Sequence, residues 1–161
     1  MAIDTVDPNL VRTSSLGDEL DKADCEALAK VMGVKRLRDG ETLVSEGGAD
    51  SSLFVLAEGK LEVLSMVEGK EAVVYTMSKG ECAGTRAFVD RAPRRATLRA
   101  EGEAVVYTLE PKKFEAMLDD HPRIVYKIMR ALFRITHANL MRMNVESREL
   151  ANYITKTHGR Y

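Results

Sequence analysis

The sequence predicts a mainly β fold, an antiparallel sandwich or barrel with flanking helices, and two patterns carry this prediction. Between Val34 and Leu109, short apolar strands alternate with X-Gly turns at intervals of about ten residues. Before and after this region, apolar residues recur at the spacing of helices. We therefore expect one domain in three parts: N-terminal helices over residues 1–33, a barrel over residues 34–110, and C-terminal helices over residues 111–161.

The N-terminal part is predicted to contain two helices. Asp7 and Pro8 supply an N-cap and a first-turn proline for a short helix that Gly17 ends. Asp21 is placed to cap a second helix that runs to about Met32, where Gly33 closes it.

The central part is predicted to consist of short strands and glycine turns. The expected strands include residues 53–56, 61–66, 72–77, 96–100 and 104–109. The turns between them are Asp39-Gly40, Gly47-Gly48, Glu58-Gly59, Glu68-Gly69, Lys79-Gly80 and Glu101-Gly102. Gly59 is expected to take a positive φ in a hairpin turn, which is a structural role.

The C-terminal part is predicted to hold a helix from Pro111, a longer one from Pro122 to about Asn144, and a short final helix over residues 147–157. The apolar residues of the long helix cover well over half of its circumference: Ile124, Val125, Ile128, Met129, Ala131, Leu132, Phe133, Ile135, Ala138 and Leu140. A helix that covers one core needs an apolar stripe of little more than about 100°. We therefore expect two partners, the barrel and a second copy of this helix in a homodimer. The alternative is that this long helix is deeply buried in the core of a single chain.

Composition excludes several classes of protein. The chain has 161 residues, 45% hydrophobic and 30% charged, with a net charge of −1, so its surface as a whole does not indicate nucleic-acid or membrane binding. Two cysteines and three well-separated histidines provide neither a disulfide framework nor metal-ligand spacing. We see no signal peptide, membrane span or paired nucleophile and base, and we expect a cytoplasmic protein that is not an enzyme and carries no cofactor or metal.

The most informative stretch runs from Gly80 to Ala100, G-E-C-A-G-T-R-A-F-V-D-R-A-P-R-R-A-T-L-R-A. Gly80 and Gly84 permit tight backbone bends, and residues 85–89 can form one helical turn with free N–H groups. Such a turn beside a guanidinium can form a phosphate-binding site. The candidate guanidiniums belong to Arg86, Arg91, Arg94 and Arg95.

This stretch resembles the phosphate-binding cassette of cyclic-nucleotide-binding domains, a family that includes catabolite-activator regulators and protein kinase A regulatory subunits. The family pattern is G-E-x-x-G-E-L-A-L-x, a spacer, then P-R-x-A-T-x-x-A, and the matching residues are Gly80, Glu81, Gly84, Ala87, Pro93, Arg94, Ala96, Thr97 and Ala100. The resemblance covers roughly residues 21–145. It implies a jelly-roll barrel that binds a cyclic nucleotide such as cyclic AMP or cyclic GMP and signals through its C-terminal helix.

Three residues depart from the family pattern. Thr85 stands where the family has a glutamate that accepts from the ribose hydroxyl, and the missing charge is expected to cost about 1–2 kcal/mol. Arg86 replaces a usually buried leucine, and Arg95 a usually small residue, which leaves the preferred base open. The predicted ligand-binding residues are Gly84, Thr85, Arg86, Ala87, Arg94, Arg95 and Thr97, with Thr136 as a weaker base contact.

Other interpretations stay open. Thr136 is more simply explained by a hydrogen bond to its own helix, Cys82 by a role as a small buried apolar residue, and Met141 and Met143 by interface packing. Only sixteen residues follow Val145, too few for a helix-turn-helix domain, so we expect no direct DNA binding and an unknown downstream protein partner. The alternative function is a degenerate domain of the same fold that binds no nucleotide and serves as a protein interaction module.

Overall fold

The computed structural model describes residues 5–158, and the side chains as far as residue 155. The described elements, in chain order, are α1 (Pro8–Thr13), α2 (Lys22–Val31), β1 (Gly33–Leu37), β2 (Thr42–Val44), β3 (Leu53–Val67), β4 (Lys70–Met77), β5 (Cys82–Ala83), α3 (Thr85–Asp90), β6 (Thr97–Leu109), α4 (Pro111–Asp120) and α5 (Pro122–His158). The order of helices, strands and helices confirms the predicted mainly β fold with flanking helices.

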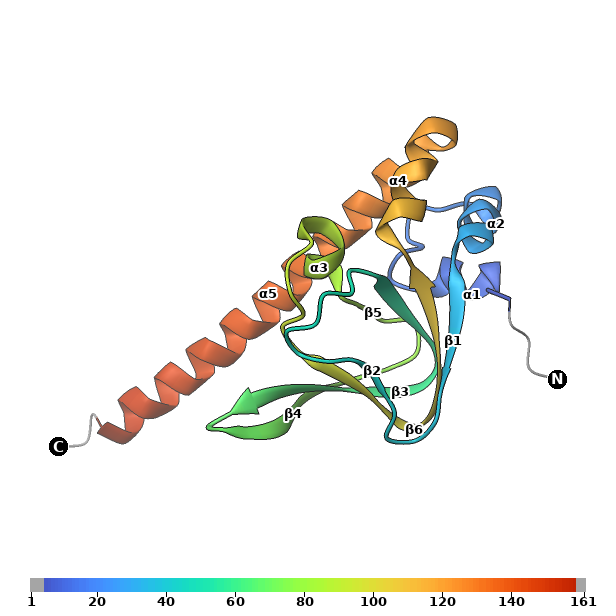
Figure 1. Cartoon of the computed structure of the whole chain (residues 1–161). Coiled ribbons are helices and arrows are strands. Elements are labelled where there is room, and N and C mark those ends of the chain that lie inside the picture. The colour runs from blue at the N-terminus through green and yellow to red at the C-terminus, as the bar shows by residue number, and fades with distance from the viewer. Residues whose placement is uncertain (1–4, 159–161) are drawn as a thin grey trace.

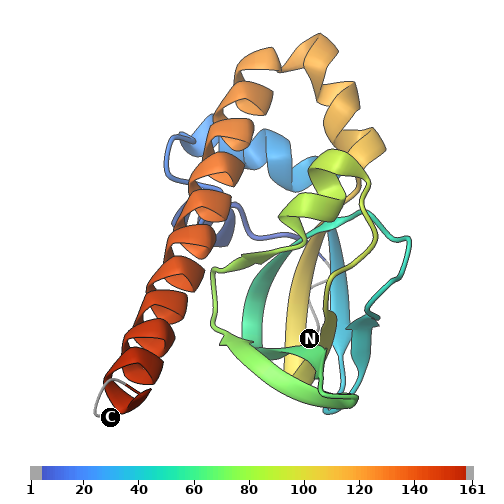
Figure 2. The ribbon, with the colours of Figure 1, turned by 90° about the vertical axis from the view of Figure 1, so that its left-hand side faces the viewer.

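The strands form one antiparallel, barrel-like sheet whose hydrogen-bonded path does not close. Its order is β1-β6-β3-β4, while β2 also pairs with β6 and β5 with β3. Figures 1 and 2 show α1, α2 and α4 grouped at one end of this sheet, with α5 running alongside it. The long strands β3 and β6 pair with each other, and every other strand pairs with one of them.

The two long strands differ from the sequence prediction. Residues 53–56 and 61–66 were expected as separate strands around a Gly59 hairpin, but both belong to the 15-residue β3. Gly59 does have a positive φ of 83°, and the pairing register with β6 shifts just before it and again across it, between Glu58 and Lys60. The hairpin prediction is wrong because an X-Gly pair can equally form a bulge, which bends a strand without ending it. The same holds for β6, which continues through Gly102.

Buried side chains form two hydrophobic clusters on either side of the sheet. One cluster lies inside the barrel and includes Phe54, Leu56 and Val106, each at most 1% exposed. The other lies between the sheet and the helices and includes Leu28 and Ile128, both fully buried. This second cluster attaches the first half of α5 to the body of the domain.

Ion pairs add to this attachment along one face of α5. Lys127 Nζ lies 2.7 Å from Asp24, and Arg130 and Arg134 both approach Glu19 within 3.1 Å. Asp24 is also the third residue of α2, where it completes a capping box with the predicted N-cap Asp21. The polar face of α5 is thereby tied to the start of α2 and the turn before it.

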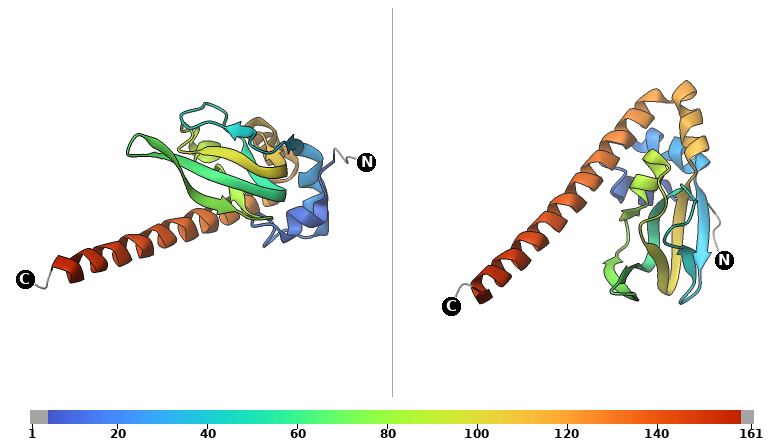
Figure 3. Two further views of the ribbon diagram at one scale, coloured as in Figure 1. Left: turned by 90° about the horizontal axis from the view of Figure 1, so that it is seen from below. Right: turned by 60° about the vertical axis from the view of Figure 1, so that its left-hand side comes forward.

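Helix α5 is longer and more regular than predicted. A break was expected near Asn144, but the helix continues to His158. The segment around residues 144–148 contains no glycine or proline, so nothing in it interrupts the hydrogen-bond ladder. Figure 3 shows the C-terminal half of α5 extending past the barrel.

The bulge in β3 leads to a stability prediction. A Cβ atom on Gly59 would lie 2.3 Å from the Glu103 carbonyl oxygen, whereas a Cβ on Gly102 would meet nothing within 4 Å. We expect Gly102→Ala to lower the free energy of unfolding by about 1–2 kcal/mol, the cost of a left-handed conformation for a residue with a side chain. Gly59→Ala should cost clearly more, because its backbone contact must also open. Urea denaturation of both variants checks this, and equal losses would contradict the bulge geometry.

Candidate functional site

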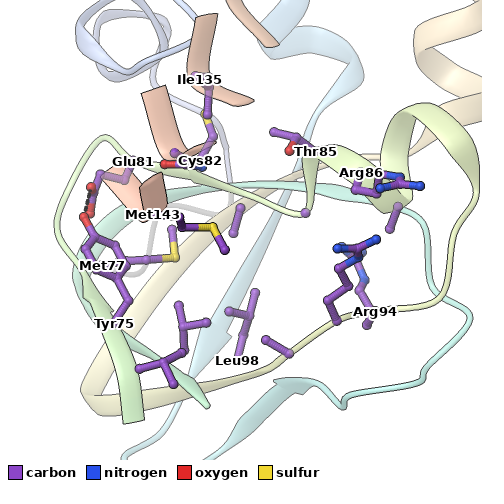
Figure 4. A pocket seen from close by; sticks show the side chains of 18 of the residues that line it. Tyr75, Met77, Glu81, Cys82, Thr85, Arg86, Arg94, Leu98, Ile135 and Met143 are labelled. Carbon is purple, nitrogen blue, oxygen red and sulfur yellow. Dashed lines mark hydrogen bonds between the residues drawn. The ribbon is translucent and has the colours of Figure 1, made fainter. Parts of the chain in front are cut away.

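A cavity of about 560 Å³ lies between the barrel, α3 and the middle of α5. Strands β4, β5 and β6 and the loop before β6 supply its walls, while Ile135, Asn139 and Arg142 of α5 line it from the other side. Figure 4 shows Arg86, Thr85 and Arg94 at one end of the cavity and Tyr75 and Glu81 at the other. Its volume lies within the roughly 300–1,000 Å³ of small-molecule pockets.

Arg94 is the most unusual side chain of this cavity, because it is a cation that is only 5% exposed. One terminal nitrogen donates to the Ser52 carbonyl at 2.6 Å and lies 3.6 Å from Asp50. Its guanidinium also packs over the Phe54 ring, 4.9 Å from the ring centre. Burial lowers the pKa of Arg94, and the nearby Asp50 carboxylate partly offsets that effect.

Two of the three nitrogens of Arg94, Nε and Nη1, are buried without a hydrogen-bond partner in the structure. An unsatisfied buried donor costs about 1–3 kcal/mol, and more when it is charged. A fold that keeps such donors beside an open cavity is suited to an anion that accepts from them. Arg94 is therefore placed to bind an anion.

Gly84 completes this end of the cavity. It caps α3 in the left-handed conformation with φ 86°, and a Cβ atom there would lie 2.2 Å from Arg94 Nη1. Only a glycine lets the guanidinium pack this closely against the backbone. A helix leaves its first N–H groups without an intrahelical acceptor, and in α3 these belong to Thr85, Arg86 and Ala87, all of which line the cavity.

The opposite end of the cavity is formed by a polar cluster. The Tyr75 hydroxyl donates to Glu81, which also accepts from the Ser78 N–H at 2.6 Å. This bond to Glu81 raises the pKa of Tyr75, with burial as the second cause. Arg142 of α5 packs over the Tyr75 ring at 4.3 Å, so this cluster connects α5 to the barrel.

The structure brings six of the eight predicted site residues to the cavity: Gly84, Thr85, Arg86, Ala87, Arg94 and Arg95. Thr97 is not among the residues that line it. Its side chain is buried and accepts from the Glu46 N–H at 2.9 Å, because alternate residues of a strand face opposite sides and Ala96 and Leu98 take the cavity side. Thr97 is therefore a structural residue in this cassette.

Thr136 also lies outside the cavity lining. Its hydroxyl is 3.4 Å from the Thr85 hydroxyl, so it links α5 to α3 instead of bonding back to its own helix. Arg91, one of the four candidate guanidiniums, pairs with Glu115 on α4 and does not line the cavity.

Sequence reasoning missed the contribution of Tyr75 and of the α5 residues Asn139 and Arg142 to the cavity. These positions lie far from the cassette in sequence, and no local pattern marks them. Cys82 was expected to be fully buried; it is partly buried and lines the cavity, and this burial raises the pKa of its thiol to about 12. Its sulfur therefore remains protonated at neutral pH.

No helix in residues 5–158 is long and apolar enough to span a membrane. The same part of the chain holds no group of three or more His, Cys, Asp or Glu side chains that could bind a metal ion.

Comparison with known proteins shows which family the chain is related to. The sequence model described as "Cyclic nucleotide-binding domain" matches residues 34–121. The cAMP-dependent protein kinase regulatory subunit of Mycosarcoma maydis is 32% identical over 87 residues, 54% of this chain and 17% of its own length. That of Blastocladiella emersonii is 31% identical over 103 residues, 63% of this chain and 26% of its own length. The chain thus spans only a small part of these relatives.

Solved structures agree with the sequence comparison. The N-terminal domain of a transcriptional regulator from Streptomyces coelicolor A3(2) superposes with a TM-score of 0.72 and 26% identity over 83% of this chain and 94% of its own. The regulatory domain of Toxoplasma gondii PKA, solved with cAMP, gives a TM-score of 0.62 and 26% identity over 70% of this chain and 43% of its own. With the family's sequence model covering the barrel and α4, the chain belongs to the cyclic nucleotide-binding domain family.

Proposed function

We propose that this chain is a regulatory sensor domain that binds a cyclic nucleotide in the 560 Å³ cavity. The phosphate lies against Arg94 and the first N–H groups of α3, and the base and sugar extend toward Tyr75 and α5. The observation that carries the proposal is the pair of unpartnered nitrogens on the buried Arg94 guanidinium. The proposed role is regulatory, in the cytoplasm, with no catalytic step.

The alternative function, a degenerate domain with a filled site, lacks the contacts that would support it. In that case Arg86 or Arg95 would pair with carboxylates across the cavity mouth. Arg86 pairs instead with Asp90, one turn along its own helix, at 2.9 Å. Both side chains of this pair are more than half exposed, and the pair joins two residues of the same helix, so it does not bridge the cavity mouth.

The ligand would act through α5, because this helix forms one wall of the cavity. Ile135, Asn139 and Arg142 line it, and Thr136 contacts Thr85 beside it. A ligand shifts a conformational equilibrium only through contacts that differ between the two states. A nucleotide that contacts both the cassette and α5 would provide such contacts.

We further propose that α5 pairs with α5 of a second copy. Its exposed apolar residues follow alternating steps of three and four residues, and they include Tyr126, Met129, Phe133, Leu140, Met143 and Leu150, each at least 39% exposed. Thr136 and Ser147 take the two remaining positions of this repeat, which we call the α5 stripe. A 3–4 spacing of apolar residues is the pattern of a two-helix coiled coil. Most of this stripe faces solvent within a single chain, although Met143 also lines the cavity, and a second helix could cover the exposed part.

Nucleotide binding can be tested by titration calorimetry with cyclic AMP and cyclic GMP. We expect heat of binding for at least one of them and a weakening of about ten- to a hundredfold in Arg94→Ala, the loss of one charge-assisted contact. Arg91→Ala is the matched control, because it removes an arginine of the same cassette whose partner is Glu115, outside the cavity. No binding of either nucleotide at millimolar concentration would refute the proposal.

The dimer can be tested with two leucines that are equally exposed. Leu140 lies on the α5 stripe and Leu118 on α4, and each is 54% exposed. Leu140→Asp should shift the mass measured by light scattering from dimer to monomer, because it places a charge in the helix pair. Leu118→Asp should leave the mass unchanged. A wild-type chain that is monomeric at micromolar concentration would contradict the proposed pairing.

A further inference from the structure

The cavity wall carries more positive charge than a singly charged ligand requires. Four arginines line it, Arg86, Arg94, Arg95 and Arg142, against two glutamates, Glu81 and Glu146. This leaves a formal excess of two positive charges around the cavity. A cyclic mononucleotide, whose phosphate is a diester, would neutralise only one of them.

The excess is concentrated at the α3 end. Figure 4 shows Arg86 and Arg94 together at this end, whereas Glu81 lies with Tyr75 at the other. The oxygens of Glu81 are already occupied by the Tyr75 hydroxyl and the Ser78 N–H. Asp50 lies 3.6 Å from Arg94 and Asp90 pairs with Arg86, but neither carboxylate lines the cavity. Both are about half exposed, so water screens these pairs.

The three departures from the family pattern all change this charge in the same direction. Thr85 replaces a carboxylate and removes a negative charge, while Arg86 and Arg95 replace uncharged residues and each add a positive one. All three line the cavity.

We propose that the preferred ligand is a nucleotide with two phosphate groups. This proposal rests on the proposed function, since the first phosphate takes the place beside Arg94 and Gly84. The second lies at the cavity mouth, where Arg86 and Arg95 are exposed and able to reorient toward it. The neutral Thr85 permits a phosphate near the sugar, where a glutamate would repel it. Guanidinium groups suit this role, because they bind phosphate oxygens in a bidentate manner.

Two kinds of molecule share this chemistry, and the experiment separates them. Cyclic AMP, adenosine 3′,5′-bisphosphate and cyclic di-AMP, followed by the guanine counterparts of all three, are titrated into the full chain by calorimetry at one fixed ionic strength. We expect at least one two-phosphate probe to bind about tenfold or more tightly than the cyclic mononucleotide with the same base. Tighter binding of the bisphosphate indicates two phosphates on one sugar, and tighter binding of the cyclic dinucleotide indicates two linked nucleosides.

Variants distinguish specific recognition from general attraction. Arg86→Ala and Arg95→Ala should each lower, several-fold, the ratio of the affinity for the two-phosphate probe to the affinity for the cyclic mononucleotide. Thr85→Glu should strengthen binding of the mononucleotide and weaken binding of the two-phosphate probe. Arg91→Ala, with the same change of charge outside the cavity, should leave the ratio unchanged, and an equal fall in that variant would overturn the proposal. Binding of the mononucleotide with no preference for a second phosphate would also overturn this proposal, but it would leave the proposed function intact. Absence of binding by every probe overturns both.

Discussion

The burial of one guanidinium organises the functional half of this molecule. Arg94 is almost completely enclosed, and three different parts of the chain must converge to hold it: the Ser52 carbonyl before β3, the Phe54 ring within β3, and the backbone of Gly84 before α3. Burying a charge is costly unless its donors are satisfied. The fold satisfies one nitrogen and leaves Nε and Nη1 without a partner, so part of this cost would remain until an anion bound there. Under the proposed function, ligand binding and local stability would therefore be coupled at this residue.

The position of Arg94 depends in turn on the bulged strands. Strand β3 begins beside Phe54 and pairs with β4 at its other end, and β6 pairs with residues 53–64 of it. The bulges at Gly59 and Gly102 bend both strands, so that a sheet with no closed hydrogen-bonded path still curves around an interior. Without this curvature, the loop that carries Arg94 and the turn at Gly84 would not face one another.

Local patterns in the sequence predicted the parts of this structure that depend on neighbouring residues. The caps at Asp7 and Asp21, the first-turn prolines of α4 and α5, and the short helix after Gly84 all follow from steric and hydrogen-bonding preferences within a few residues. The resemblance of the cassette to a family placed Arg94 at the site. Pairings between distant residues could not be predicted in this way. Whether Glu58-Gly59 forms a hairpin or a bulge depends on what lies opposite in β6, and the contacts of Tyr75 with Glu81 and Arg142 arise only once α5 packs beside the barrel.

Different faces and different parts of helix α5 make different contacts. Its first half is held by the buried Ile128 and by ion pairs to Glu19 and Asp24, so it cannot move independently of the helices at that end. Its middle lines the cavity with residues such as Asn139 and Arg142, and Thr136 contacts Thr85 beside it; these side chains are mostly exposed. Contacts of this kind are individually weak, so a ligand of ordinary affinity can change their balance. Because the α5 stripe continues from the anchored half into the half beyond the barrel, any such change at the cavity would alter the angle at which a second helix could pack.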